Sequence, residues 1–215
     1  AARTINTSQG DFDYSQLVLA TGAQPIRVPL HGDAADRVLS INSLDDYARF
    51  HTQLLEQKDA TKHVLMMGAG LIGCEFANDL IASGYQVTVV DPATGPIAAL
   101  LPPPVSAQLQ DALGALGVRW HFGATVQSVN HMDSRYQAEL SDGQTITANV
   151  VLSAIGLRAD TSLAKAAGLA CERGIVVDAI LQTSAQHIYA LGDSTQYGER
   201  GMPYVMPIMH AAKAL

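Results

Sequence analysis

The feature that most constrains this chain is the order of residues 63–91, HVLMMGAGLIGCEFANDLIASGYQVTVVD. An apolar run leads into a turn with three glycines, and a helix-like stretch follows as far as Gly84. A second apolar run then ends at Asp91. The glycines of the turn are Gly68, Gly70 and Gly73. Strand, glycine turn, helix, strand and terminal acid in this order are typical of a βαβ unit that binds a dinucleotide.

Each glycine has a predicted task in such a unit. Gly68 allows the tight turn, Gly70 lets the backbone approach a pyrophosphate, and Gly73 lets helix and strand pack closely. Asp91 follows at the distance expected of an acid that holds a ribose 2′-hydroxyl. The alternative is a glycine-rich turn in another kind of α/β protein, and the complete order of elements disfavours it.

Asp91 also predicts which nicotinamide cofactor is used. Its carboxylate can accept hydrogen bonds from both ribose hydroxyls of NADH, whereas NADPH would bring a 2′-phosphate close to a like charge. Residues 92–101 contain no Lys or Arg to offset that repulsion. We therefore expect NADH, with the alternative that Asp91 only opens a turn with Pro92.

Composition excludes several classes of function. The chain has 215 residues, 48% hydrophobic and 15% charged, which fits an ordinary globular protein of one large or two small domains. No apolar run reaches the roughly 18 residues that a membrane span needs. A formal charge of −7 argues against nucleic acid as a partner. Since the chain opens without Met and stops in a helix-like stretch, we expect an internal piece of a longer protein.

The sulfur and imidazole groups predict no metal site and a reducing compartment. Cys74 and Cys171 lie far apart and form no C-x-x-C pattern, which is typical of a cytoplasmic protein. Cys74 could be a redox thiol, although a small buried apolar residue is the favoured interpretation. The seven histidines show no pair at metal-ligand spacing, so they are assigned to the surface or the core.

The rest of the chain predicts an α/β fold. Ser8–Asp13 is expected to be a turn and Pro102–Pro104 a loop, while Ser141–Gln144 is expected to turn a hairpin. The run over 150–155 indicates a buried parallel strand. Further strands are predicted at 2–7, 16–21, 118–122, 125–131, 135–140, 144–148, 174–178 and 187–191. Helices are predicted from Asn42 or Ser43, after Pro104, over 161–168, and from Met206 or Pro207.

A second informative segment is His187–Asp193, where a short apolar strand ends at Gly192 and an acid. Parallel sheets place their ligands at the carboxyl ends of strands, so Asp193 is a candidate ligand residue. Taken alone, an acid at this place is more often a helix cap or a solubilising loop residue. Thr183 precedes it by ten positions.

With both segments in view, the chain resembles the FAD-dependent pyridine nucleotide-disulfide oxidoreductases with two dinucleotide domains. In that family an Asp after a YALG stretch holds the ribityl chain of FAD, and Asp193 matches it. An A-T-G stretch before the inserted NAD domain matches Ala20-Thr21-Gly22, and the A-I-G that closes the insertion matches Ala154-Ile155-Gly156.

Within the family, four segments are similar to rubredoxin reductases. They are GAGLIGCEFANDL (68–80), SINSLDDYARF (40–50), SAIGLRADTSLAKAAGLA (153–170), and GIVVD with YALGD. The resemblance implies a Rossmann-like three-layer NAD domain at 39–156, inserted between FAD-domain segments at 1–38 and 157–215. The family's first G-x-G-x-x-G and its C-terminal interface domain find no match here, so the FAD domain is expected to be incomplete.

The resemblance also implies the site residues. Glu75 would orient the nicotinamide, with a stabilising helix dipole as the alternative reason for an acid there. Met206 would lie at a helix start that faces the flavin, with core packing as the alternative. The implied NAD-binding residues are Gly68, Gly70, Leu71, Ile72, Gly73, Glu75, Asp91 and Gly156. The implied FAD-binding residues are Ala20, Thr21, Gly22, Gly192, Asp193 and Met206.

The resemblance finally implies the reaction. NADH would reduce protein-bound FAD, and electrons would pass to rubredoxin or another small iron–sulfur carrier. The missing C-x-x-C argues against dithiol chemistry in this part of the chain. A ferredoxin reductase of a dioxygenase system, or a nitrite or flavorubredoxin reductase, would share the same motifs. A nucleotide-sensing module without turnover is the alternative from outside the enzymes.

Overall fold

The computed structural model describes residues 3–56, 62–199, 201 and 203–215. The chain divides into two compact units. One, here called the inserted unit, is Pro25–Gly156, and the other, the interrupted unit, combines Ala1–Gln24 with Leu157–Leu215. No helix in the described part of the chain is both long and apolar enough to cross a membrane.

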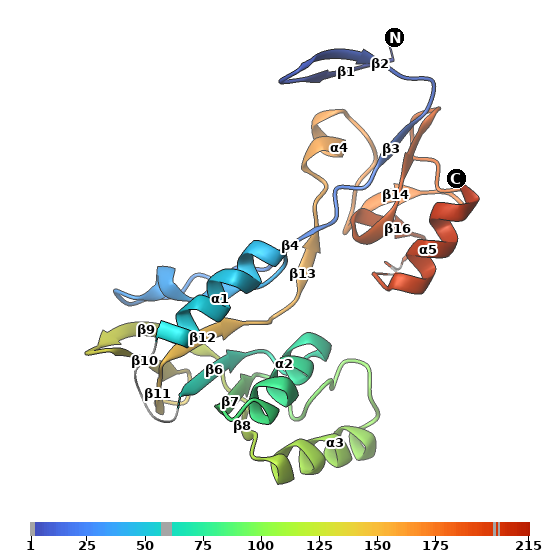
Figure 1. The fold of residues 1–215 in the computed structure, drawn as a ribbon. Helices are drawn as coiled ribbons and strands as arrows, with labels where there is room; N and C mark the ends of the chain where they lie inside the picture. Colours follow the sequence, from blue (N-terminus) through green and yellow to red (C-terminus); the bar gives the residue numbers. More distant parts are fainter. Residues whose placement is uncertain (1–2, 57–61, 200, 202) are drawn as a thin grey trace. The chain divides into compact units, whose positions relative to one another are not determined.

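The inserted unit is built around a five-stranded parallel sheet (Figure 1) with the strand order β5-β12-β6-β7-β8. Its central strands are apolar on both faces, which a parallel sheet covered on both sides requires. The expected buried strand after residue 149 is confirmed, because β12 pairs with β6 on one side and β5 on the other. The strands are β5 (Leu39–Ser40), β6 (His63–Met67), β7 (Gln86–Asp91), β8 (Arg119–Phe122) and β12 (Val150–Ser153).

Alternate residues of these strands face two different layers. Val64 and Met66 of β6 belong to a core that they share with three helices, whereas Leu65 and Met67 belong to a core on the opposite face. The helices are α1 (Leu44–Glu56), α2 (Leu71–Ala82) and α3 (Pro103–Leu116). The opposite layer is an antiparallel sheet of β9 (Val126–Met132), β10 (Arg135–Leu140) and β11 (Thr145–Ala148). The three layers and the Rossmann-like fold are therefore as expected.

The interrupted unit is made of short two-stranded sheets. Its core joins Leu19 and Ala190, from two paired parallel strands, with Ala164, Leu169, Ile175 and Val177. The strand pairs are β1 (Thr4–Thr7) with β2 (Gly10–Asp13), β3 (Leu17–Leu19) with β15 (Ile188–Ala190), β4 (Ala23–Pro25) with β13 (Leu157–Ala159), and β14 (Ile175–Val177) with β16 (Thr195–Tyr197). The helices are α4 (Ser162–Ala166) and α5 (Val205–Ala214), with the 3₁₀ turn η2 at Gly192–Ser194.

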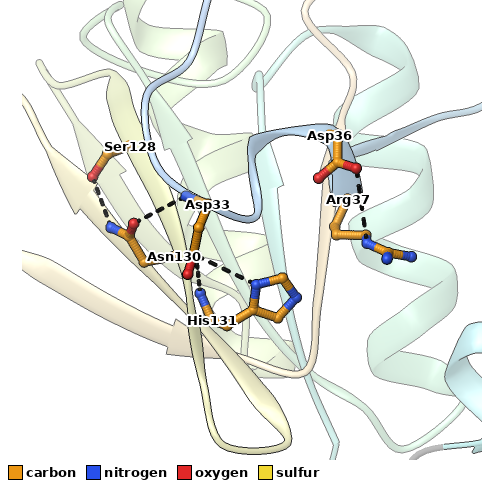
Figure 2. A network of polar contacts seen from close by, with 6 residues as sticks. All are labelled: Asp33, Asp36, Arg37, Ser128, Asn130 and His131. Carbon is orange, nitrogen blue, oxygen red and sulfur yellow. Dashed lines mark hydrogen bonds and ion pairs between the residues drawn. The ribbon is translucent and has the colours of Figure 1, made fainter.

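Residues 25–38 pack with the inserted unit, whereas the sequence analysis grouped them with the first segment. Ala34 is fully buried in the core of the inserted unit. A Cβ on Gly32 would lie 2.2 Å from the carbonyl oxygen of Val129, so only glycine fits this approach. Figure 2 shows Asp33 between Asn130 and His131: its amide donates to the Asn130 side chain, and its carboxylate accepts from the His131 amide. These contacts with β9, and the 3₁₀ turn η1 (Ala35–Arg37) beside them, hold the segment.

Two local predictions were wrong. Residues 8–13 were expected to be a turn, but β2 occupies Gly10–Asp13 and pairs antiparallel with β1. This hairpin is held by polar cross-strand contacts such as Thr4 with Asp13, so it lacks an apolar alternation to reveal it. The prolines expected in a loop open α3 instead, because the first turn of a helix needs no donor from its N–H groups. Residue 2 of the expected first strand lies outside the described residues.

Candidate functional site

The glycine-rich turn joins β6 to α2 and is packed tightly on one side. Gly68 has φ +105°, and a Cβ there would lie 2.6 Å from the carbonyl oxygen of Ala154. A Cβ on Gly73 would lie 2.1 Å from the carbonyl oxygen of Gly68. Both positions therefore exclude any larger residue, because the atoms that they would meet belong to the backbone.

The other side of the turn is open. Gly70 is exposed, and a Cβ there would meet nothing within 4 Å. Gly70 is the N-cap of α2, and no side chain caps it. The amides of Gly70, Leu71 and Ile72 find no hydrogen-bond acceptor within the described ranges. A helix N-terminus with free amides and positive dipole suits an anionic group such as a pyrophosphate.

Asp91 lies at the carboxyl end of β7, and both of its oxygens accept backbone hydrogen bonds. Oδ2 accepts from the amide of Ala69 at 2.7 Å, and Oδ1 accepts from the amide of Ala93 at 2.7 Å. The second bond is the turn that the alternative interpretation expected. The first ties the end of β7 to the glycine-rich turn. A carboxylate has about four lone-pair positions, so acceptor capacity remains for a ligand hydroxyl.

Cys74 lies behind this turn in a setting that makes its thiol inert. Burial, followed by the nearby charge of Asp91, raises the pKa of Cys74 to about 11. The protonated thiol donates to the carbonyl of Ala69 at 3.5 Å. This environment favours the interpretation of Cys74 as a small buried residue over a redox thiol.

Glu75 is exposed on α2, where the first helical turn contains no acidic residue. The dipole explanation for Glu75 was therefore based on a wrong position, since the helix starts at Leu71 and Glu75 follows its first turn. Leu71 and Ile72 are 49% and 40% exposed beside the open face of Gly70. Gly156 has φ +110° and its carbonyl accepts from the amide of Ile26 at 3.0 Å.

In the interrupted unit, Asp193 lies just beyond the carboxyl end of β15. The strand pairs in parallel with β3, and the Leu191 amide continues the ladder by donating to Leu19. Gly192 then turns the chain with φ +83° into η2. Across residues 3–56, 62–199, 201 and 203–215, no side chain or amide donates to the Asp193 carboxylate. Thr183 is used differently, because its hydroxyl donates to the carbonyl of Ile188 at 2.9 Å.

The segment Ala20-Thr21-Gly22 follows β3 and is fixed by a residue that the sequence analysis did not select. The Thr21 hydroxyl donates to the carbonyl of Asp160 at 2.7 Å, and the Asp160 amide donates to the carbonyl of Gly22 at 2.9 Å. No sequence pattern around Asp160 predicts this pairing, because the partners are separated by the whole inserted unit.

Met206 lies in the first turn of α5, which begins at Val205. Core packing was the expected alternative role for this residue, and that expectation was wrong. Met206 is 61% exposed, and α5 has no buried residue among those described.

Comparison with known proteins gives the family. The model of the pyridine nucleotide-disulphide oxidoreductase family matches residues 2–214. The chain belongs to this family. A rubredoxin–NAD(+) reductase of Alcanivorax borkumensis is 48% identical over 205 residues, which are 95% of this chain and 53% of that protein. A nitric oxide reductase FlRd–NAD(+) reductase of Aeromonas salmonicida is 43% identical over 216 residues, which are 100% of this chain and 54% of that protein.

A solved structure of the same kind supports the pyridine nucleotide-disulphide oxidoreductase fold. The ferredoxin reductase from Rhodopseudomonas palustris matches with a TM-score of 0.83 and 33% identity, over 91% of this chain and 48% of that one. The chain thus spans about half the length of the relatives it matches, 53% and 54% for the two curated proteins above.

Proposed function

We propose that the protein containing this chain is an NADH-dependent FAD flavoprotein that reduces rubredoxin or a similar small iron–sulfur protein. The inserted unit would hold NADH and the interrupted unit would hold part of FAD. The observation that carries the proposal is the pair of strand ends: a glycine-rich turn with free helix amides at β6, and an Asp without a described donor at β15. The named relatives include reductases of both rubredoxin and flavorubredoxin type.

The residues present fit an FAD ribityl chain and an NADH diphosphate. Asp193 offers acceptor oxygens that no described group uses, and a ribityl hydroxyl is a suitable donor for them. Gly22 and Gly192 would give the backbone close access, since a Cβ at either would meet nothing within 4 Å. Ala20, Thr21 and Met206 complete the FAD residues that we propose. On the other unit, Gly68, Gly70, Leu71, Ile72, Gly73 and Gly156 complete the NADH site.

FAD, when bound, would accept the hydride of NADH and release its two electrons one at a time. One NADH therefore reduces two molecules of a one-electron carrier and yields NAD⁺ and one proton. This chain's residues would bind and orient the partners of that transfer. We assign to Glu75 the orientation of the nicotinamide, and to Asp91 and the amides of α2 the binding of the adenosine half.

NADH is the proposed cofactor because Asp91 presents a negative charge where the adenosine ribose would bind. A 2′-phosphate there would meet repulsion without a cation in residues 92–101, which should weaken NADPH by roughly a hundredfold. The test is the ratio of the two dissociation constants for the native chain and for Asp91→Asn, which keeps the shape but removes the charge. A native ratio near one, or a ratio that Asn leaves unchanged, would contradict this role.

The electron acceptor is tested by steady-state NADH oxidation with rubredoxin, ferredoxin, thioredoxin or glutathione disulfide. We expect turnover with the iron–sulfur proteins and none with the disulfides, because the chain has two separate unpaired cysteines and no dithiol. Fast turnover with ferredoxin alone would favour the second candidate, a ferredoxin reductase. Fast turnover with a disulfide alone would overturn the proposal.

A sensor without turnover would bind NADH and show no acceptor-dependent oxidation by the full-length protein. The same assay therefore separates the enzyme from the nucleotide-sensing alternative. We place the reaction in the cytoplasm, whose reducing conditions suit the two unpaired cysteines.

A further inference from the structure

The peptide that links Ala69 to Gly70 is fixed from several directions. Ala69 is 2% exposed, and its amide donates to Asp91 Oδ2 at 2.7 Å. Its carbonyl oxygen accepts from the amide of Ile97 at 2.7 Å and from the thiol of Cys74 at 3.5 Å. The middle residue of the glycine-rich turn is therefore held by the segment that follows β7 as well as by α2.

Ile97 reaches Ala69 through an unusual backbone conformation. Its φ is +52°, in the left-handed region, which is a true outlier for a β-branched residue. Such a conformation persists only where the surroundings enforce it. Here the Ile97 side chain packs against the helix-side core, and its carbonyl accepts from the amides of Leu100 and Leu101 at 2.9 and 3.0 Å.

The segment is also attached to α3. The buried hydroxyl of Ser106 donates to the carbonyl of Pro96 at 2.6 Å. A Cβ on Gly95 would lie 2.6 Å from that same hydroxyl oxygen, so this approach requires glycine. The residue before Ile97 is thus fixed on a helix of the layer that covers the parallel sheet.

The direction of the Ala69 carbonyl sets the direction of the Gly70 amide. The peptide between them is trans, and a planar trans peptide points its C=O and N–H in opposite directions. When the carbonyl points at Ile97, the Gly70 N–H must point away from residues 92–101. That side of Gly70 is exposed and has open space around the Cβ position.

We propose that Ile97 is a positioning residue for the dinucleotide site: its left-handed backbone delivers the N–H that orients the Ala69–Gly70 peptide, so that the Gly70 amide faces the diphosphate. The inference rests on the proposed function of the inserted unit as an NADH site. The side chain serves to hold the backbone in the left-handed conformation, and the amide makes the functional contact.

The test separates the amide from the side chain in the 215-residue chain. An amide-to-ester replacement at Ile97, made with the matching α-hydroxy acid, removes the N–H and keeps the side chain. The matched control is the same replacement at Leu101, whose amide donates to Ile97 and not to the turn. Ile97→Asn keeps the N–H, and Asn tolerates a positive φ better than most residues.

The readouts are the dissociation constant of NADH, by fluorescence titration, and the melting temperature. We expect the Ile97 ester to weaken NADH binding about three- to tenfold, the range for one neutral hydrogen bond. The Leu101 ester and Ile97→Asn should stay within about twofold of the native constant. Ile97→Asn should nevertheless melt earlier, because it loses core packing.

Two results would overturn the inference while leaving the NADH site in place. One is native affinity in the Ile97 ester, and the other is an Ile97→Asn variant as weak as that ester. If the native chain itself bound no NADH, the proposed function of the unit would fail, and this inference with it.

Discussion

Asp91 and Asp193 each follow a short apolar strand of a parallel sheet, yet their carboxylates have different neighbours. Asp91 accepts hydrogen bonds from the amides of Ala69 and Ala93, so it is part of the turn beside it. Asp193 accepts none from the residues that the structure describes. The glycines next to them differ in the same way. Gly68 is pressed against Ala154, whereas Gly192 has open space.

The difference shows that a strand ending in an acid identifies a place in the fold and not a task. At the end of β7 the acid stabilises the loop and has spare capacity for a ligand. At the end of β15 the acid has capacity for a ligand and no described structural bond. Substitutions in the two units should therefore separate folding from cofactor binding.

The largest expected contrast is between Gly68→Ala and Gly192→Ala. At Gly68 the new Cβ would combine a φ of +105° with a contact 2.6 Å from a backbone oxygen, which should lower the free energy of unfolding by about 4 kcal/mol. At Gly192 only the positive φ matters, which should cost about 1 kcal/mol. Urea denaturation followed by circular dichroism measures both. Equal losses would contradict the contrast between a packed and an open turn.

Removing the two carboxylates should give the next largest contrast. Asp91→Ala loses two charge-assisted hydrogen bonds and leaves the buried Ala69 amide without a partner, which should cost about 3 kcal/mol of unfolding free energy. Asp193→Ala should change stability by less than about 0.5 kcal/mol. Asp91→Asn is the control, since it retains one acceptor and should show an intermediate loss. A destabilised Asp193→Ala variant would mean that this side chain has a structural role.

Flavin binding should reverse the order of the two aspartates. In the full-length protein, Asp193→Ala should weaken FAD by about 2 kcal/mol, roughly thirtyfold, because a charged hydrogen bond to a ribityl hydroxyl is lost. Asp91→Asn should leave FAD affinity unchanged. The measurement is flavin retention in gel filtration with a fluorescence titration of the apoprotein. Unchanged flavin occupancy in Asp193→Ala would remove this residue from the site.

The smallest effect concerns the two cysteines, one in each unit. Cys74 is buried with a pKa of about 11, and Cys171 is half-buried. At pH 8 only about one Cys74 in a thousand is a thiolate, so iodoacetamide should label Cys171 first. Peptide mass spectrometry over time gives both rates. Faster labelling of Cys74 would show that the turn around Ala69 opens readily.

The same thiol predicts a loss of stability in alkali. Burial raises the pKa of Cys74 in the folded chain from 9.0 to about 11, so the folded state keeps a proton that the unfolded chain releases between these values. The stabilising contribution is complete below pH 9 and is lost as the pH rises through about 11. Cys74→Ala should flatten this part of the stability profile, and a profile that stays as steep would assign it to another group.

Sequence patterns predicted the inserted unit well because its elements follow simple periodic rules. The runs before Gly68 and after Asn149 are apolar on both faces, and such runs are typical of strands in a covered parallel sheet. The polar hairpin of β1 and β2 was missed because its residues are exposed and give no periodic apolar signal. The place of residues 25–38 was missed because it depends on the approach of Gly32 to Val129.

The sequence by itself determined the βαβ unit, the three glycines and the two acids, because these are local requirements of backbone geometry and strand order. Only the tertiary structure decided what each acid contacts. The amides of Ala69 and Ala93 reach Asp91, and the amide of Ile97 reaches Ala69, through a loop conformation that no residue preference predicts. The physical reason is that packing can hold a β-branched residue at a φ of +52° that its own sterics disfavour.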